Sequence, residues 1–297
     1  MIDLLMSGDV LLEDAADVDR LVQLLVDRVG ITEQRRTWGH QGPGYRAMFV
    51  RVHKLFFVAP TTIEILAGGG TNPAAFAAQR ERPVRTHATV FASKTFDVVV
   101  EHVRANGLRH IVYPPDAALP FPRLWLGLSP DDDEYEAAVD GGLRLEVIPY
   151  EGLRIPEATY DGPRPDGSFE RMVARTFLVD DVAGTLDRVR VCLGWDGDAE
   201  VVDGRHGPTA VLRPTDPLSA AFELVRPTKA GPLLDFYERY GAGPYSFRLG
   251  VNGLDAALTD LDRRGTRYRR DGDVATVDPD QLDGVVVELS DVGDPLA

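Results

Sequence analysis

The chain has 297 residues, 44% of them hydrophobic and 27% charged, and 32 basic against 47 acidic residues give a net charge of −15. This composition is typical of a globular protein long enough for two domains. The acidic balance argues against nucleic acid as a partner, because phosphates require a basic face. No stretch approaches the ~20 apolar residues that span a bilayer, and a single cysteine excludes an internal disulfide framework. We therefore expect a cytoplasmic protein that binds neither membrane nor nucleic acid.

In the first half of the chain, the predicted elements follow the order of a strand, a helix and further strands, and this order occurs twice. An apolar run leads into residues at helical spacing that end at Gly30, and a second strand pattern leads into a helix that Gly107 closes. The predicted elements are a strand over 5–12, a helix over 17–29, strands over 46–52, 54–59, 62–66 and 87–91, a helix from 96 that closes at 107, and strands over 123–128 and 142–148.

The second half repeats this order. Its helices end at Gly194 and Gly265, and the predicted elements are a strand over 174–179, a helix over 182–194, strands over 210–212, 221–225 and 246–251, a helix over 254–265, and a strand over 284–289. Thirteen positions separate Asp17 from Gly30, and thirteen separate Asp181 from Gly194. Matching helix lengths in a matching order indicate a duplication.

The duplication predicts two homologous domains, at 1–152 and 171–297. Each would contain two units of the type βαβββ. Between them, residues 153–170 are rich in proline, glycine and charge, which is typical of a linker.

Two strand motifs recur in the two halves. Thr62-Ile63-Glu64-Ile65-Leu66 is echoed by Ala221-Phe222-Glu223-Leu224-Val225, and Leu143-Arg144-Leu145-Glu146-Val147 by Val285-Val286-Val287-Glu288-Leu289. Together with the strand and helix that follow His87, these motifs resemble the vicinal oxygen chelate superfamily, which includes glyoxalase I, bleomycin-resistance proteins and extradiol dioxygenases. The resemblance implies an α+β fold in which tandem βαβββ modules form cup-shaped mixed sheets, arranged as two glyoxalase-like domains.

The resemblance also implies a metal site in the N-terminal cup. Residues that match the superfamily pattern there are Glu64, His87 and Glu146, and such imidazole and carboxylate ligands suit a divalent ion that holds two substrate oxygens. The ligand on the first strand is less defined. Counting back from the helix gives Ser7 or Val10, with Asp9 between them as a substitute.

The C-terminal domain lacks both imidazole positions of the pattern. The matching residues are Ala174, Glu223, Ser246 and Glu288. We therefore expect no metal site in that domain.

Each candidate residue also has a structural interpretation. His87 could be a strand histidine satisfied by a neighbour, and Glu64 and Glu146 could line a polar cup or pair with arginine, because a buried carboxylate needs a partner. His53 could supply a replacement imidazole. The aromatic residues that could form either a pocket or part of the core are Trp38, Tyr45, Phe57, Phe91 and Trp125.

Two functions follow. The first is a metal-dependent lyase, isomerase or dioxygenase acting on a small oxygenated molecule, with a divalent metal of unknown identity and with Glu146 and His87 as catalytic residues. The second is a metal-free protein that sequesters a hydrophobic or cationic compound, as bleomycin-resistance proteins do; the degenerate C-terminal site and the acidic balance favour it. Both functions imply a small-molecule ligand, and a homodimer is compatible with either.

Overall fold

The computed structural model describes residues 2–31, 35–36, 41–42, 45–51, 61–67, 79, 81–116, 119–131, 134–153 and 165–292. The predicted strand over 54–59, most of the predicted linker and the side chains of Trp38, Tyr45, His53 and Phe57 lie outside these residues. Among the helices within them, none has both the length and the apolar character needed to cross a membrane.

The first half of the chain folds into two modules, each a strand, a helix and further strands. Module 1 consists of β1 (Leu4–Leu12), α1 (Ala15–Leu24) with its π-helical continuation η1 (Leu25–Val29), β2 (Arg35–Arg36), β3 (Gln41–Gly42), β4 (Tyr45–Arg51) and β5 (Thr62–Ala67). Module 2 consists of β6 (Thr89–Ser93), α3 (Phe96–Ala105), β7 (His110–Tyr113), β8 (Arg123–Leu126), α4 (Ala137–Asp140) and β9 (Leu145–Pro149), followed by the 3-10 turn η2 (Tyr150–Leu153).

The second half forms two further modules. Module 3 consists of β10 (Phe169–Leu178), α5 (Val182–Leu193), β11 (Val202–Gly204), β12 (Gly207–Leu212) and β13 (Ala221–Val225), and α6 (Pro232–Tyr240) follows it. Module 4 consists of β14 (Gly243–Val251), α7 (Leu254–Arg263), β15 (Tyr268–Asp271), β16 (Val274–Val277), η3 (Pro279–Gln281) and β17 (Val286–Asp291).

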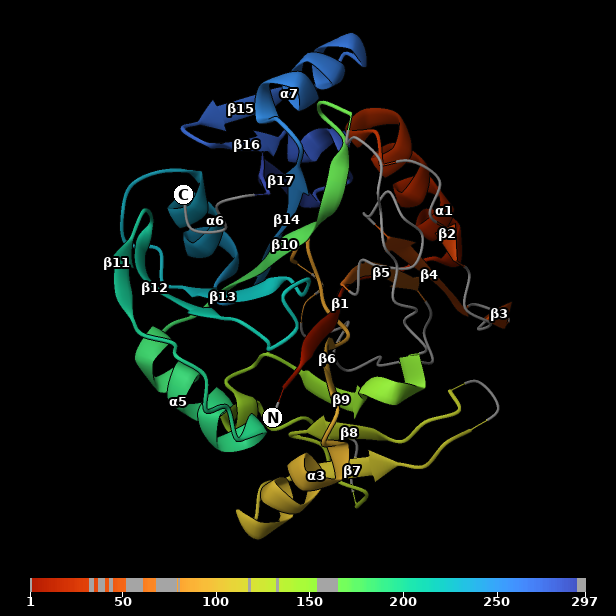
Figure 1. The fold of residues 1–297 in the computed structure, drawn as a ribbon, viewed down its shortest axis with the longest axis vertical. Helices are drawn as coiled ribbons and strands as arrows, with labels where there is room; N and C mark the ends of the chain where they lie inside the picture. The colour runs from red at the N-terminus through yellow and green to blue at the C-terminus, as the bar shows by residue number, and fades with distance from the viewer. Residues whose placement is uncertain are drawn as a thin grey trace. The chain divides into compact units, whose positions relative to one another are not determined.

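The strands form two curled, mixed sheets (Figure 1). The strand order is β2-β4-β5-β1-β6-β9-β8-β7 in the first sheet, where β3 also pairs with β4, and β11-β12-β13-β10-β14-β17-β16-β15 in the second. The first strand of a module pairs in parallel with its last strand, as β1 does with β5, β6 with β9 and β14 with β17. The predicted α+β fold of tandem βαβββ modules is confirmed.

The chain divides into two compact units. Unit 1 comprises Met1–Met6, Ala88–Arg154 and Thr176–Tyr245, and thus most of modules 2 and 3, whereas unit 2 comprises Ser7–His87, Ile155–Arg175 and Ser246–Ala297, and thus most of modules 1 and 4 together with residues 169–175 of β10. Each unit takes strands from both sheets. The predicted domains, 1–152 and 171–297, divide the chain differently and stay a prediction.

The helix ends follow the predicted pattern. Gly30, Gly107, Gly194 and Gly265 all have a positive φ, between 57° and 86°, which is the left-handed conformation that terminates a helix. Strand ends are less well predicted, since β6 begins at Thr89 and not at residue 87. The prediction also missed α6 and the strands β7, β11, β15 and β16; each of these strands has only three or four residues, too few to show a periodic pattern.

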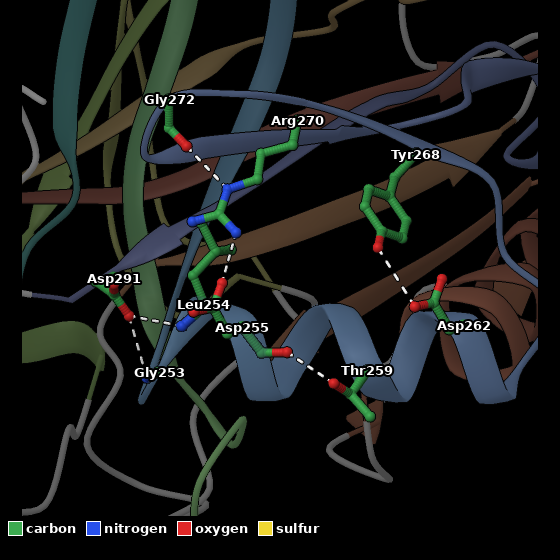
Figure 2. Close-up of polar contacts among 9 residues, drawn as sticks. All are labelled: Gly253, Leu254, Asp255, Thr259, Asp262, Tyr268, Arg270, Gly272 and Asp291. Carbon is green, nitrogen blue, oxygen red and sulfur yellow. Dashed lines mark hydrogen bonds and ion pairs between the residues drawn. The ribbon is translucent and has the colours of Figure 1, made fainter.

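Module 4 shows how the helix is fixed to its sheet. The Asp291 carboxylate, at the end of β17, accepts hydrogen bonds from the backbone N–H groups of Gly253 and Leu254, 3.1 and 2.7 Å away, and so caps α7 (Figure 2). From β15, Arg270 pairs with Asp255 and the Tyr268 hydroxyl contacts Asp262, both on α7. These three strand residues therefore point towards α7.

Candidate functional site

The last strand of every module carries a glutamate at an equivalent place. In the register, Glu64 of β5 lies directly opposite Asp9 of β1, Glu146 of β9 opposite Val90 of β6, and Glu288 of β17 opposite Arg248 of β14. In module 3, the Thr176 hydroxyl of β10 donates a hydrogen bond of 2.8 Å to Glu223 of β13. Residues opposite one another in a sheet share a face, so the side chain of each glutamate lies next to that of its partner on the first strand of the same module.

The pairing of the first and last strands places other first-strand residues opposite the glutamates than the count along the sequence predicted. The first-strand partners of the glutamates are Asp9, Val90, Thr176 and Arg248, where the count gave Ser7 or Val10, His87, Ala174 and Ser246; of the latter, Ser246 still reaches Glu288 through its hydroxyl. The reason is that only two residues separate β1 from α1, and two separate β14 from α7, so the strands reach closer to their helices than the count assumed. Of the positions weighed in the sequence, Asp9 is the one that the register places beside Glu64.

His87 lies before β6 and close to Asp9 in unit 2. The Asp9 carboxylate, 1% exposed, accepts a hydrogen bond of 2.6 Å from the His87 backbone N–H and another from the Thr86 hydroxyl. Unit 2 thus brings together Asp9, Glu64 and His87, whereas Glu146 belongs to unit 1. Two donors already bind Asp9, which fixes the entry to β6.

A fully buried arginine lies beside Asp9. Arg175 of β10 donates hydrogen bonds to the backbone carbonyls of Ser246, at 3.2 Å, and Asp9, at 3.4 Å, and its guanidinium carbon lies 3.9 Å from the centre of the Phe247 ring. Burial lowers the pKa of Arg175 to about 9. The positive charge of Arg82 lowers this pKa further, whereas the negative charge of Asp9 raises it. At neutral pH the guanidinium therefore remains charged.

In unit 1, a row of side chains crosses β6, β9, β8 and β7. The register places Val90, Glu146, Trp125 and Ile111 side by side, so they share one face of the sheet. Val90, Glu146 and Trp125 are 6%, 7% and 8% exposed, whereas Phe91, Leu145 and Leu124 on the opposite face are wholly buried. Solvent thus has slight access to the face that carries Glu146.

The corresponding glutamate of module 4 is already bound by the protein. One oxygen of Glu288 accepts a hydrogen bond of 3.3 Å from Arg248 Nε and another of 3.1 Å from the Ser246 hydroxyl. The Arg248 and Glu288 side chains form an ion pair and are 14% and 12% exposed. A guanidinium therefore occupies the position at which a metal ligand would stand.

These donor sets do not fit the metal site that the resemblance implies. The register opposes none of Glu64, Glu146 and Glu288 to a histidine, and Val90 and Arg248 cannot act as ligands. Within the ranges that the structure describes, no three or more His, Cys, Asp and Glu side chains are grouped so as to hold a metal ion.

A cavity of about 500 Å³ in unit 1 lies apart from these rows. It is lined by residues from the segment that follows α3, from α4 and from α5, such as Leu108, Val139 and Arg188. None of the residues that the sequence singled out for the site lines it.

Comparison with known proteins bears on the fold. No family model and no curated protein matches the chain. Among solved structures, a mutant of 4-hydroxymandelate synthase from Streptomyces coelicolor matches with a TM-score of 0.61 and 11% identity, over 99% of this chain and 94% of that one. At this identity the match shows a shared fold, and it agrees with the tandem βαβββ modules described above.

Shorter matches are methylmalonyl-CoA epimerases. The enzyme from Streptomyces coelicolor aligns over 44% of this chain and 99% of its own, with 20% identity and a TM-score of 0.37. The one from Mycobacterium tuberculosis aligns over 42% and 89%, with 21% identity and a TM-score of 0.36.

Proposed function

We propose that this chain is a metal-independent protein that binds a small organic cation with an aromatic or apolar part. The observation that carries the proposal is the row in unit 1 in which β9 presents Glu146 directly opposite Trp125 of β8. A carboxylate attracts a cation by charge, and the face of an indole ring attracts it further. Both side chains are more than nine-tenths buried, so water screens these interactions little.

The apolar members of the row support this choice of ligand. Val90 and Ile111 flank Glu146 and Trp125, so a carboxylate is set among apolar and aromatic side chains, as in many small-molecule sites. The net charge of −15 also favours the approach of cations over anions.

The other glutamate rows support the metal-independent part of the proposal. Thr176 donates to Glu223 and Arg248 to Glu288, so in the second sheet both carboxylates act as hydrogen-bond acceptors of the protein. In the first sheet, Val90 stands where a ligand to a metal beside Glu146 would be expected. Modules 2, 3 and 4 thus retain their glutamate, but the residue beside it is a hydrogen-bond donor or an apolar side chain where a metal ligand would be needed.

The test is calorimetric titration of the full chain, dialysed against a chelator, with benzyltrimethylammonium. We expect saturable binding at one site, at least tenfold weaker in Glu146→Gln, which corresponds to about 1.4 kcal/mol. Trp125→Leu should weaken binding about three- to tenfold because the ring contributes about 0.5–1 kcal/mol or more. Glu101→Gln is the matched control: it removes the same charge from an exposed place on α3 in the same unit, and should leave binding unchanged.

Two results would overturn the proposal. Equal weakening by Glu146→Gln and Glu101→Gln would show attraction to the acidic surface as a whole. Binding that is lost after chelation and restored by a divalent ion, together with stoichiometric metal in the purified protein, would favour the metal-dependent enzyme with Glu64, His87 and Glu146 as ligands.

A further inference from the structure

The cavity of unit 1 lies where the helices of module 2 meet the helix of module 3. Its walls come from α5, from α4 and from the segment that follows α3, whereas the Glu146 row lies on strands. The cavity has a volume of about 500 Å³, which is within the range of roughly 300–1,000 Å³ that is typical of small-molecule sites. It is therefore a second candidate site, separate from the Glu146 row.

Hydrogen bonds between the helices fix the walls of this cavity. A ring nitrogen of His102 on α3 lies 2.7 Å from the Val191 carbonyl oxygen of α5. The buried Cys192 thiol of α5 donates a hydrogen bond of 3.0 Å to the Val139 carbonyl of α4. The protein thus holds the cavity open before a ligand binds, which reduces the cost of ordering the site.

Part of the cavity lining is apolar. Leu108, Val139 and Val191 contribute aliphatic side chains from three different segments. Val191 is 48% exposed, although valine is among the residues most often buried. An aliphatic or aromatic group bound here would remove this apolar surface from water, which is favourable.

Charged side chains of both signs line the same cavity, and two of them are bound by the protein. Arg109 donates hydrogen bonds to the carbonyls of Gly127, at 3.2 Å, and Glu134, at 3.0 Å. Asp187 accepts a hydrogen bond of 3.2 Å from Arg190. These two residues therefore have partners that hold them in the wall.

The other two charged residues of the lining are Glu136, just before α4, and Arg188 on α5. Both are exposed, and among the residues that the structure describes neither side chain makes a hydrogen bond or an ion pair. They line one cavity without pairing with each other. A ligand with an ammonium group and a carboxylate would bind both, the carboxylate through parallel N–H donors of the guanidinium.

We infer that this cavity binds a zwitterion with an apolar side chain, which is the chemistry of a free amino acid and of a short peptide. The ligand carboxylate would bind to Arg188 and its ammonium group to Glu136, while its side chain would contact Leu108, Val139 and Val191. The lining has as many acidic as basic side chains, so a ligand without net charge suits it. The inference does not depend on the cation site proposed for the sheet of unit 1.

The test is a titration of the full chain with leucine and with the dipeptide leucyl-leucine, followed by NMR of the leucine and valine methyl groups. We expect saturable binding with shifts of the methyl signals of Leu108, Val139 and Val191. The tighter ligand tells whether the occupant is a free amino acid or a peptide. Its N-acetylated form, without the ammonium group, and its amidated form, without the carboxylate, should each bind at least about fivefold more weakly.

Variants test the two charges and the space. Arg188→Gln and Glu136→Gln should each raise the Kd about three- to tenfold. The matched controls are Arg104→Gln and Glu101→Gln, which remove the same charges from exposed places on α3 outside the cavity lining and should leave the Kd unchanged. Ala138→Phe, at an exposed place in the lining, should fill the cavity and abolish binding.

Three results would overturn the inference. The first is the absence of saturable binding of both leucine and leucyl-leucine. The second is equal binding of the zwitterion and its acetylated or amidated form. The third is equal effects of the cavity variants and the control variants. Arg188→Gln should leave the titration of benzyltrimethylammonium unchanged, so failure of this inference and failure of the proposed function are distinguishable.

Discussion

Truncation of Arg175 should produce one of the largest losses of stability in unit 2. Its guanidinium donates to Ser246 and Asp9 carbonyls and lies over the Phe247 ring, and the side chain is wholly buried. It also packs against the backbone of β1, where a Cβ on Gly8 would lie only 3.0 Å from its Cδ. The long side chain thus fills space as well as carrying charge.

Two substitutions separate these contributions. Arg175→Ala removes the packing and the guanidinium donors to two carbonyls, so we expect a loss of about 4 kcal/mol. Arg175→Met keeps most of the volume and removes the unfavourable burial of a charge, so we expect a loss of about 1 kcal/mol or less. The difference in the free energy of unfolding between the two variants measures the contribution of packing.

The pH dependence gives an independent check on the charge. Because burial lowers the pKa of Arg175 to about 9 from 12.5, the native state releases this proton at lower pH than the unfolded state does. The unfolded state then binds more protons above pH 9, so this group makes the free energy of unfolding rise with pH. Relative to Arg175→Met, the natural protein should gain up to about 1.4 kcal/mol per pH unit between about pH 9 and 11, and nothing below pH 8.

Urea denaturation of the full chain and both variants at pH 7, 9 and 10.5 measures these values. A loss below about 1 kcal/mol for Arg175→Ala would show that the side chain is not packed as described. An equal loss in both variants would refute the packing argument, and parallel pH profiles for the natural protein and Arg175→Met would refute the lowered pKa.

Two further predictions concern module 4. Asp291→Ala removes the acceptor for the Gly253 and Leu254 N–H groups, so it should lower the free energy of unfolding by about 1 kcal/mol in urea denaturation, whereas Asp273→Ala, at an exposed turn, should not. Gly250→Ala would place a Cβ 2.6 Å from a methyl group of Val173, so it should cost about 2 kcal/mol. If the contact is the cause, adding Val173→Ala to that variant should cost less than Val173→Ala alone, and purely additive losses would exclude it.

The equivalent rows of modules 2 and 4 show how one scaffold position can change its chemistry. Parallel pairing of first and last strand keeps Glu146 and Glu288 at the same register, while the residue opposite is Val90 in one case and Arg248 in the other. The sequence repeat made the glutamates visible, since they stand in matching motifs. The residues opposite these glutamates lie on strands distant in the chain, and no local sequence pattern links a glutamate to the residue opposite it.

Local sequence was sufficient for the helix that follows the first strand of each module (α1, α3, α5 and α7), for the glycine ends of these helices and for the module order. These features depend on periodicity and on backbone conformations that a few neighbouring residues decide, as at Gly30 and Gly194. The same reasoning matched Glu64 with Glu223 and Glu146 with Glu288.

Only the tertiary structure decided which residue stands beside each of those glutamates. Register between strands depends on turn lengths and on packing across the whole sheet, and a shift of one residue reverses the face of every side chain. The placement of Asp9, Val90 and Arg248, with His87 outside its predicted strand, follows from that register. The chemistry of the candidate site was therefore set by long-range pairing, which the sequence pattern does not contain.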